Sequence, residues 1–344
     1  MKRKTYIFLS LLIIFISSFV ISSCEVEFDP NDDWKETTIV YGILDQDADT
    51  TFIRVQKCFV GKGNYIQFAK QKDSIYYKSE DLDVRMYAYF PWDTNGWDTT
   101  RAQKKYSFIY TESYKKPEGG FYSEVAPVYY CVTKNNMSAD LVYRLEVRNL
   151  KTGNFVYSKT SLVADYKITK PTGTAFGFPL VNGQNILIAG WYTRNNGASG
   201  EMARLFQPSI RFNFMENGEP AYVDLDFKPK ANPYQINETE ITYYIYSTDV
   251  LSQIKSKVSK RGTAVRSFFQ DTPCFEIFIY GCNDVLSNYI SNNQPSESLV
   301  EKPLYTNINN GIGIFASRRL HIKKGYTQWD PRFEATIKGY DIGF

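Results

Sequence analysis

The chain has 344 residues, 16% of them aromatic, and its 40 basic and 37 acidic residues leave a net charge of only +3. This balance provides no overall positive charge for nucleic-acid binding, and the single histidine, His321, argues against zinc sites built from several histidines. The 27 tyrosines and 24 phenylalanines instead favour β-strands, because aromatic side chains pack well on pleated sheets.

The first 23 residues predict a secretory signal peptide. A basic start at residues 2–4 precedes an apolar run at residues 6–21, and two serines then lead to Cys24. Small residues followed by a cysteine resemble the bacterial lipobox, in which the thiol is lipidated and the chain is cut before it. We therefore expect a signal peptide over residues 1–23 and a mature protein whose Cys24 carries acyl chains, such as palmitate, in a bacterial membrane.

Residues 24–36 are expected to form a tether between this anchor and the folded chain. The acidic beginning of the tether, at Glu25 and Glu27, resembles the surface-export signals of lipoproteins from the Bacteroidota. That resemblance implies an outer-membrane protein exposed at the cell surface, and a plain solvated tether is the alternative. A single transmembrane helix is the alternative to cleavage, since the apolar run is near the lower length limit for spanning a bilayer.

Residues 37–44 and 50–57 predict two strands of a hairpin, joined by a turn at residues 45–49. The turn, Asp-Gln-Asp-Ala-Asp, places carboxylates at alternate positions, as a calcium loop does. A complete calcium loop would need glycine and glutamate where this chain has Thr50 and Gln56. We therefore expect a charged hairpin turn rather than a metal site.

Residues 82–90 alternate between apolar and polar side chains and predict a third strand. A polar loop follows at residues 91–98 and contains Trp92 and Trp97. A tryptophan exposed on a loop is typical of a ligand surface, because its ring buries a large area at a low entropy cost. The two residues are thus the candidate ligand contacts, and packing of one or both back onto the sheet is the alternative.

Residues 141–149 and 155–162 predict two more strands around a turn. Short alternating strands without a long helix are typical of a β-sandwich of the immunoglobulin or fibronectin type III kind. Proline and glycine at residues 170–173 then indicate a domain boundary. We expect a sandwich domain over residues 37–170.

The region 171–344 is expected to form a second strand-rich domain. Its predicted strands lie at residues 185–193, 209–215, 221–227, 240–246 and 274–280, with a hairpin turn at Asn217-Gly218. Residues 247–260 and 284–290 predict two short amphipathic helices that cover a sheet.

Four cysteines follow Cys24, in a compartment that permits disulfides. Cys274 and Cys282 flank one predicted strand, which holds them farther apart than a disulfide allows. A bridge between Cys58 and Cys131 stays open, and free buried cysteines are the alternative. The sequence contains no phosphate loop, dinucleotide fingerprint or nucleophile elbow, so we expect no cofactor.

Residues 303–315, Pro-Leu-Tyr-Thr-Asn-Ile-Asn-Asn-Gly-Ile-Gly-Ile-Phe, resemble the closing signature of a Bacteroidota outer-membrane lipoprotein family of unknown function. The preceding strand and helix match the order in that family, whose members tend to be encoded near TonB-dependent receptors. The resemblance implies no catalytic residues. The glycines also have a structural explanation, because they permit positive φ and close backbone approach at a strand entrance. After His321 we expect one or two further strands.

Two classes of function are consistent with these patterns. The first is a non-enzymatic binding or accessory module held at the membrane, with an outer-membrane receptor as its partner. The second is an anchored glycan hydrolase that uses carboxylates dispersed along the chain, which need no local motif. A shallow aromatic surface would favour the first class, and a deep pocket with two carboxylates would favour the second.

Overall fold

The computed structural model describes residues 37–58, 67, 69–114, 125–172, 180–181, 184–192, 200–232, 240–269, 274–293, 304–325 and 331–344. The expected signal peptide, the tether and Cys24 lie outside these residues. Within them the chain is mainly β, as the sequence predicts, with strands in three sheets and four α-helices. None of the helices in the described ranges has the length and apolar character needed to span a bilayer.

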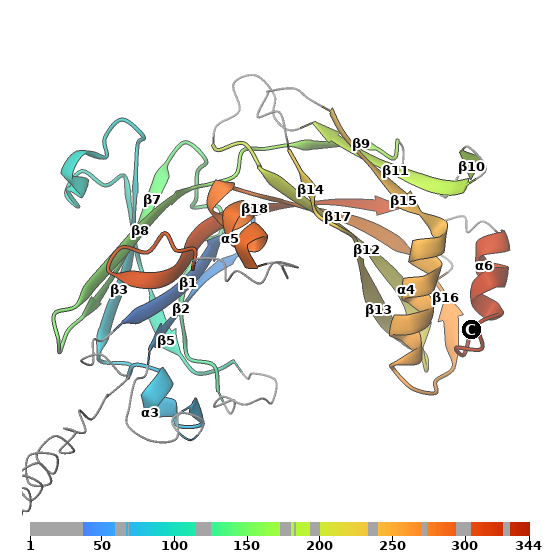
Figure 1. The fold of residues 1–344 in the computed structure, drawn as a ribbon, viewed down its shortest axis with the longest axis horizontal. Coiled ribbons are helices and arrows are strands. Elements are labelled where there is room, and N and C mark those ends of the chain that lie inside the picture. The colour runs from blue at the N-terminus through green and yellow to red at the C-terminus, as the bar shows by residue number, and fades with distance from the viewer. Residues whose placement is uncertain are drawn as a thin grey trace, which may run out of the picture. The chain divides into compact units, whose positions relative to one another are not determined.

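The largest sheet has ten strands, and eight of them follow one another in the order β13-β12-β17-β18-β1-β2-β6-β5 (Figure 1). Their bounds in that order are Glu219–Asp226, Leu205–Glu216, Phe275–Cys282, Gly311–Gly325, Thr38–Leu44, Thr50–Lys57, Val128–Val132 and Ile109–Thr111. Two short strands, β14 (Lys230–Ala231) and β16 (Arg266–Phe268), also pair with β12.

The two other sheets have four strands each. One has the order β4 (Lys104–Ser107), β3 (Leu82–Tyr89), β7 (Val142–Asn149) and β8 (Phe155–Ser161). The other contains β10 (Leu180–Val181), β11 (Gln184–Tyr192) and β15 (Glu240–Tyr246), with β9 (Lys167–Lys170) paired to β11. The helices are α3 (Lys72–Ile75), α4 (Ser247–Ser259), α5 (Asp284–Asn293) and α6 (Pro331–Lys338).

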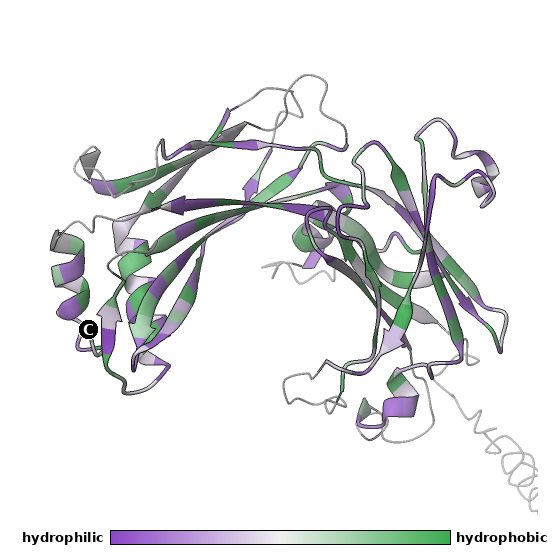
Figure 2. Cartoon of the chain, turned by 180° about the vertical axis from the view of Figure 1, so that it is seen from behind, coloured by the Kyte–Doolittle hydropathy of each residue, from purple (hydrophilic) through white to green (hydrophobic). Residues whose placement is uncertain are grey.

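Hydrophobic and hydrophilic residues alternate along many of the strands (Figure 2), and this alternation produces the first core. Side chains from β3 and β7, such as Met86 and Leu145, meet Val40 of β1, Ile53 of β2 and Phe315 of β18. The sheet of β3 and β7 therefore packs face to face on β1 and β2 as a β-sandwich. That this sandwich is of the immunoglobulin or fibronectin type III kind stays a prediction.

A second core contains residues from β11, β12, β15 and β17. Helix α4 covers this core and packs on β11, β13 and β15 (Figure 1). Val250, Ile254 and Val258 of α4 are buried and Leu251 packs against them, so the apolar stripe expected from the sequence is confirmed.

Strand β18 joins elements from both sides of the expected boundary at residue 170. It pairs parallel with β1 and antiparallel with β17, so one sheet contains strands from both regions. The first core nevertheless consists mostly of residues 40–162 and the second of residues 163–342. The division into domains 37–170 and 171–344 stays a prediction.

The Asn-Gly segment that precedes β18 is hydrogen-bonded to the strand that it leads into. The Asn307 side chain donates to the carbonyl of Phe315 at 2.8 Å and accepts from its N–H at 2.9 Å. Gly313 has a φ of +110°, and a Cβ there would lie 2.0 Å from the carbonyl oxygen of Val40. The structural explanation of the glycines is therefore confirmed.

The chain after His321 differs from the prediction of further strands. Strand β18 continues to Gly325, and residues 331–338 then form helix α6. Phe333 and Ile337, four residues apart, are buried on one side of this helix in the second core. Burial of that pair explains why the segment is a helix.

The expected charged turn between β1 and β2 is confirmed. Asp45 forms an ion pair with Arg318 at 3.7 Å, Asp47 with Arg319 at 3.1 Å and Asp49 with Lys134 at 3.0 Å. In the described part of the chain no group of three His, Cys, Asp or Glu residues is arranged to hold a metal ion. The four cysteines of these residues are free thiols.

Candidate functional site

The two tryptophans of the loop after β3 have different environments. Trp92 is 77% exposed, and its ring stacks on Phe90 with centroids 4.6 Å apart. Trp97 turns back toward the sheet, where its ring meets Tyr89 edge to face at 5.2 Å. Burial raises the pKa of Tyr89 to about 12. One ring is thus available to a ligand and the other covers a buried tyrosine, and ligand contact by either stays a prediction.

Trp92 lines a hollow of about 490 Å³ together with Phe90, Asp140, Ser161 and Glu201. The Glu201 carboxylate accepts the backbone N–H of Asp284 at 3.0 Å, at the start of α5. Burial raises the pKa of Glu201 above its ordinary value. The carboxyl group therefore has a structural task at the helix start, besides its position in the hollow.

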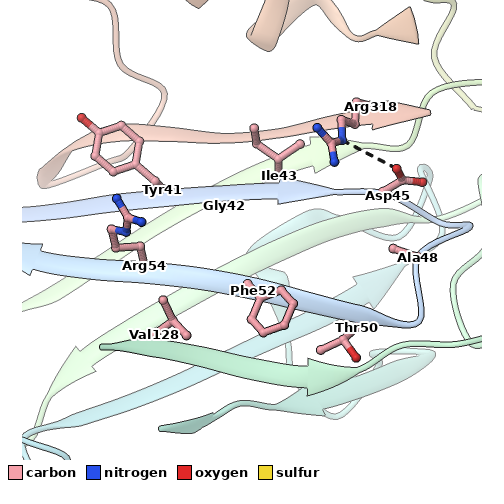
Figure 3. Close-up of a pocket in the computed structure, with 10 residues that line it drawn as sticks. All are labelled: Tyr41, Gly42, Ile43, Asp45, Ala48, Thr50, Phe52, Arg54, Val128 and Arg318. Carbon is pink, nitrogen blue, oxygen red and sulfur yellow. Dashed lines mark ion pairs between the residues drawn. The ribbon is translucent and has the colours of Figure 1, made fainter. Parts of the chain in front are cut away.

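The aromatic face is a second surface, on the outward side of β1, β2 and β6 (Figure 3). We define it by Tyr41 and Ile43 of β1, Phe52 and Arg54 of β2, and Val128 of β6. Tyr41, Ile43 and Phe52 are 37%, 38% and 38% exposed. A hollow of about 340 Å³ lies over these residues. Three large apolar side chains thus face solvent from the middle of a sheet.

Strand register holds the aromatic face in place. Tyr41 lies opposite Arg54 across β1 and β2, and Phe52 lies opposite Tyr130 of β6. The Phe52 ring also meets Tyr114 edge to face, with centroids 5.2 Å apart. Because β1 is paired on both sides, the face is rigid and preorganised for contact.

Packing on the inward side of β1 fixes the side chains on its outward side. Gly42 lies between Tyr41 and Ile43 and faces the core, where a Cβ would come within 2.5 Å of Ile53. The missing side chain lets Ile53 and Phe315 fill the space beneath the strand. The outward residues are therefore fixed by the packing behind them.

Helix α5 covers the neighbouring part of the same sheet face. Ile314 and Ala316 of β18 are buried under Leu286 of this helix, in a small separate core. Burial raises the pKa of Tyr41, and its electrostatic and hydrogen-bond interaction with Tyr289 of α5 adds to that effect. The cover ends at Tyr41, so the adjacent side chains of β1 and β2 remain open to solvent.

The aromatic face also carries positive charge. Arg318 borders it and pairs with Asp45, whose pKa is raised by burial (Figure 3). Arg54 has no carboxylate within ion-pair distance among the described residues. The face can therefore bury apolar side chains of a partner and offer one unpaired guanidinium to an acidic group.

Sequence reasoning missed this surface, although β1 contained a signal for it. The segment Ile39-Val40-Tyr41-Gly42-Ile43-Leu44 has large apolar residues in both phases of the strand alternation. A strand with one face in solvent alternates between apolar and polar residues, whereas a strand apolar on both faces is buried on both. That pattern indicates that the outward side chains of β1 are to be covered as well as the inward ones.

The comparisons with known proteins add no family to this picture. No protein-family model matches the chain, and a search of the curated proteins gives no match. Cys24 lies outside the described residues, so its lipidation and the resemblance to the lipoprotein family stay predictions.

Proposed function

We propose that this chain is a non-enzymatic accessory module, anchored in the outer membrane through Cys24, that docks on a neighbouring membrane protein through the aromatic face. The observation that carries the proposal is the abrupt end of the cover that α5 provides. Ile314 of β18 is buried under the helix, whereas its neighbours Tyr41 and Ile43 of β1 are more than a third exposed. A partner that binds beside α5 would cover the exposed side chains of β1 on the same side of the sheet.

The residue types of the aromatic face support a protein partner. Tyrosine, phenylalanine and arginine dominate the energetic centres of protein interfaces, because they bury large areas at a low entropy cost. Tyr41, Phe52 and Arg54 occupy adjacent positions on two paired strands. Arg54, which has no ion pair among the residues that the structure describes, favours a partner segment that combines apolar side chains with an acidic group.

The expected anchor supports a partner in the same membrane. Twelve residues separate Cys24 from Thr37, where the described chain begins. Fully extended, this tether spans at most about 45 Å. A short tether raises the effective concentration of the aromatic face for a partner in the same bilayer. A TonB-dependent receptor, which the family resemblance implies, is the partner we propose.

The anchor can be tested separately from the docking. Cys24→Ala should abolish incorporation of labelled palmitate and should leave the protein without its lipid in an intact-mass measurement. A lipid that persists in this variant would contradict the assignment of Cys24.

The docking is tested by purification of the tagged lipoprotein from its native outer membrane. We expect the double variant Ile43→Ser, Phe52→Ser to lose at least 90% of the co-purified receptor, roughly the tenfold loss that a hot-spot residue produces. Tyr244→Ser, at an exposed tyrosine of β15, is the matched control and should retain it. Equal recovery with both variants would contradict the proposal.

One observation favours the second class, an anchored glycan hydrolase. Asp140 and Glu201 line one hollow with Trp92, and the raised pKa of Glu201 is the property expected of a general acid. Release of reducing sugar from outer-membrane glycans, lost in Glu201→Gln and Asp140→Asn, would support this alternative. Activity that both variants retain would exclude these two carboxylates.

A further inference from the structure

The outward side of the sheet β4-β3-β7-β8 concentrates positive charge. After residue 23 the chain has 37 basic and 37 acidic residues, because residues 2–4 supply the remaining three basic ones. On this one face, alternation with the buried residues places five basic and only two acidic side chains: Arg85, Lys105, Arg144, Arg148, Lys159, Asp83 and Glu146. We name it the basic face. An otherwise balanced chain thus carries a local excess of three positive charges.

Strand register aligns three of these cations in one row across the sheet. Lys105 of β4 lies opposite Tyr87 of β3, Tyr87 lies opposite Arg144 of β7, and Arg144 lies opposite Lys159 of β8. Since neighbouring strands are about 4.8 Å apart, the row spans about 14 Å. The charges are therefore spread along a line and do not converge on one point.

Aromatic rings lie among the cations of the basic face. The Trp97 ring lies 5.2 Å from the Arg144 guanidinium and 5.8 Å from the Lys159 ammonium. Arg144 also lies 4.2 Å from the ring of Tyr157. The rings hold the basic side chains extended over the sheet, which lowers the entropy cost when an anion binds them.

Most of this charge is available to a partner. Arg144 pairs with Glu146 at 2.7 Å and Arg85 with Asp83 at 2.9 Å. Lys105, Arg148 and Lys159 are exposed, and none of them has an ion-pair partner among the described residues. Two of these three cations, Lys105 and Lys159, therefore form the ends of the row.

We propose that the basic face lies against the anionic lipid headgroups of the membrane that holds the protein. Charges spread over a row suit a surface with many anions better than they suit one small anion. Interleaved tryptophan, tyrosine and basic side chains are also the residue types that proteins place at the headgroup level of a bilayer. The expected tether of twelve residues after Cys24 keeps this face within reach of such a surface. The inference is independent of the partner proposed for the aromatic face.

The test is hydrogen exchange of the lipidated protein in vesicles of phosphatidylcholine, alone or with 30% phosphatidylglycerol. We expect exchange in residues 95–98 and 142–161 to slow about fivefold only where anionic lipid is present, with loss of that protection at about 0.5 M salt, which screens exposed charges. The double variant Lys105→Glu, Lys159→Glu should abolish the protection. The matched control, Lys228→Glu with Lys260→Glu, reverses two exposed charges elsewhere and should keep it.

Three outcomes would overturn the inference. The first is equal protection in neutral vesicles, and the second is protection that survives the reversal at Lys105 and Lys159. The third is the same protection from soluble glycerol phosphate at the same phosphate concentration, which would assign the face to a free anion.

Discussion

The two outward surfaces of the sandwich use similar residue types in opposite ways. On the aromatic face, Tyr41 and Phe52 are exposed, and Arg54 beside them has no ion pair within the described residues. On the basic face, Arg144 lies over the ring of Tyr157 and under that of Trp97, so cations and rings cover one another. The comparison teaches that aromatic content alone does not identify a contact surface. A ring is covered where a cation lies against it, as Arg144 does against Tyr157 and Trp97.

The largest expected change in the free energy of unfolding concerns the core beneath the aromatic face. Phe315 is fully buried and packs under Gly42. Phe315→Ala should lower the free energy of unfolding by about 4 kcal/mol, through lost burial and the cavity left behind. Urea unfolding measures this change, and Ile322→Ala, at an exposed position of the same strand, is the control. A loss below about 1 kcal/mol would show that this core does not support the faces.

The ion pairs of Glu216 in the second region give the next largest effect and contrast with the exposed Arg85–Asp83 pair of the basic face. Glu216 accepts hydrogen bonds from Arg261 and Arg266, which lower its pKa to about 2. Glu216→Gln should cost about 2 kcal/mol, because the Arg266 side chain is only 1% exposed and would lose its charged partner. Asp83→Asn, which breaks an exposed pair with Arg85, should cost less than about 0.5 kcal/mol.

The pH dependence of Glu216 follows from the direction of its shift. A lowered pKa in the folded state stabilises the protein above the unfolded value of 4.5. This contribution should disappear as the pH falls from 4.5 toward 2, and Glu216→Gln should remove that part of the pH dependence. Urea midpoints across this range measure it. A variant with the same pH profile as the parent chain would contradict the assignment.

Arg144 provides the direct contrast between the two faces. Arg144→Ala should lower the free energy of unfolding by about 1.5 kcal/mol, because it removes a guanidinium held between two rings and beside Glu146. Arg54→Ala on the aromatic face should cost less than about 0.5 kcal/mol, since that arginine has no ion pair in the described ranges. Equal losses from the two variants, in the same urea experiment, would remove the distinction between the faces.

A small change in the free energy of unfolding is expected for the variant that should weaken binding most. Phe52→Ser with Ile43→Ser should cost about 1 kcal/mol or less, because both side chains are already more than a third exposed. Thermal unfolding of the purified variant measures this cost. A loss as large as that of Phe315→Ala would mean that the aromatic face is part of the core.

Strand periodicity predicted most of the fold, because each strand alternates over one core. The strand at residues 82–90 and the helix at residues 247–260 are examples, since Val84, Met86, Val250 and Ile254 are all buried as expected. Helix α6 was missed because its pair of buried residues, Phe333 and Ile337, is too short a pattern to stand out. The parallel pairing of β1 with β18 joins residues about 270 apart, and no local pattern encodes such a contact.

The candidate site was less predictable for a physical reason. Trp92 and Trp97 are equivalent in a sequence pattern, and only the fold shows that Trp97 turns back over Tyr89. Tyr41 and Phe52 attract no notice in the sequence, because aromatic residues are ordinary in strands. Their exposure depends on where α5 ends its cover of the sheet, and this position is set by tertiary packing.

Docking through the aromatic face requires a partner in the membrane, and site-specific photocrosslinking in living cells tests this most directly. A photoreactive amino acid at position 43 should give one major adduct with an outer-membrane receptor, and the same amino acid at position 244 should give none. The adduct at position 43 should disappear when Phe52 is changed to Ser. No adduct at position 43, or equal adducts at both positions, would contradict the docking of this protein through its aromatic face.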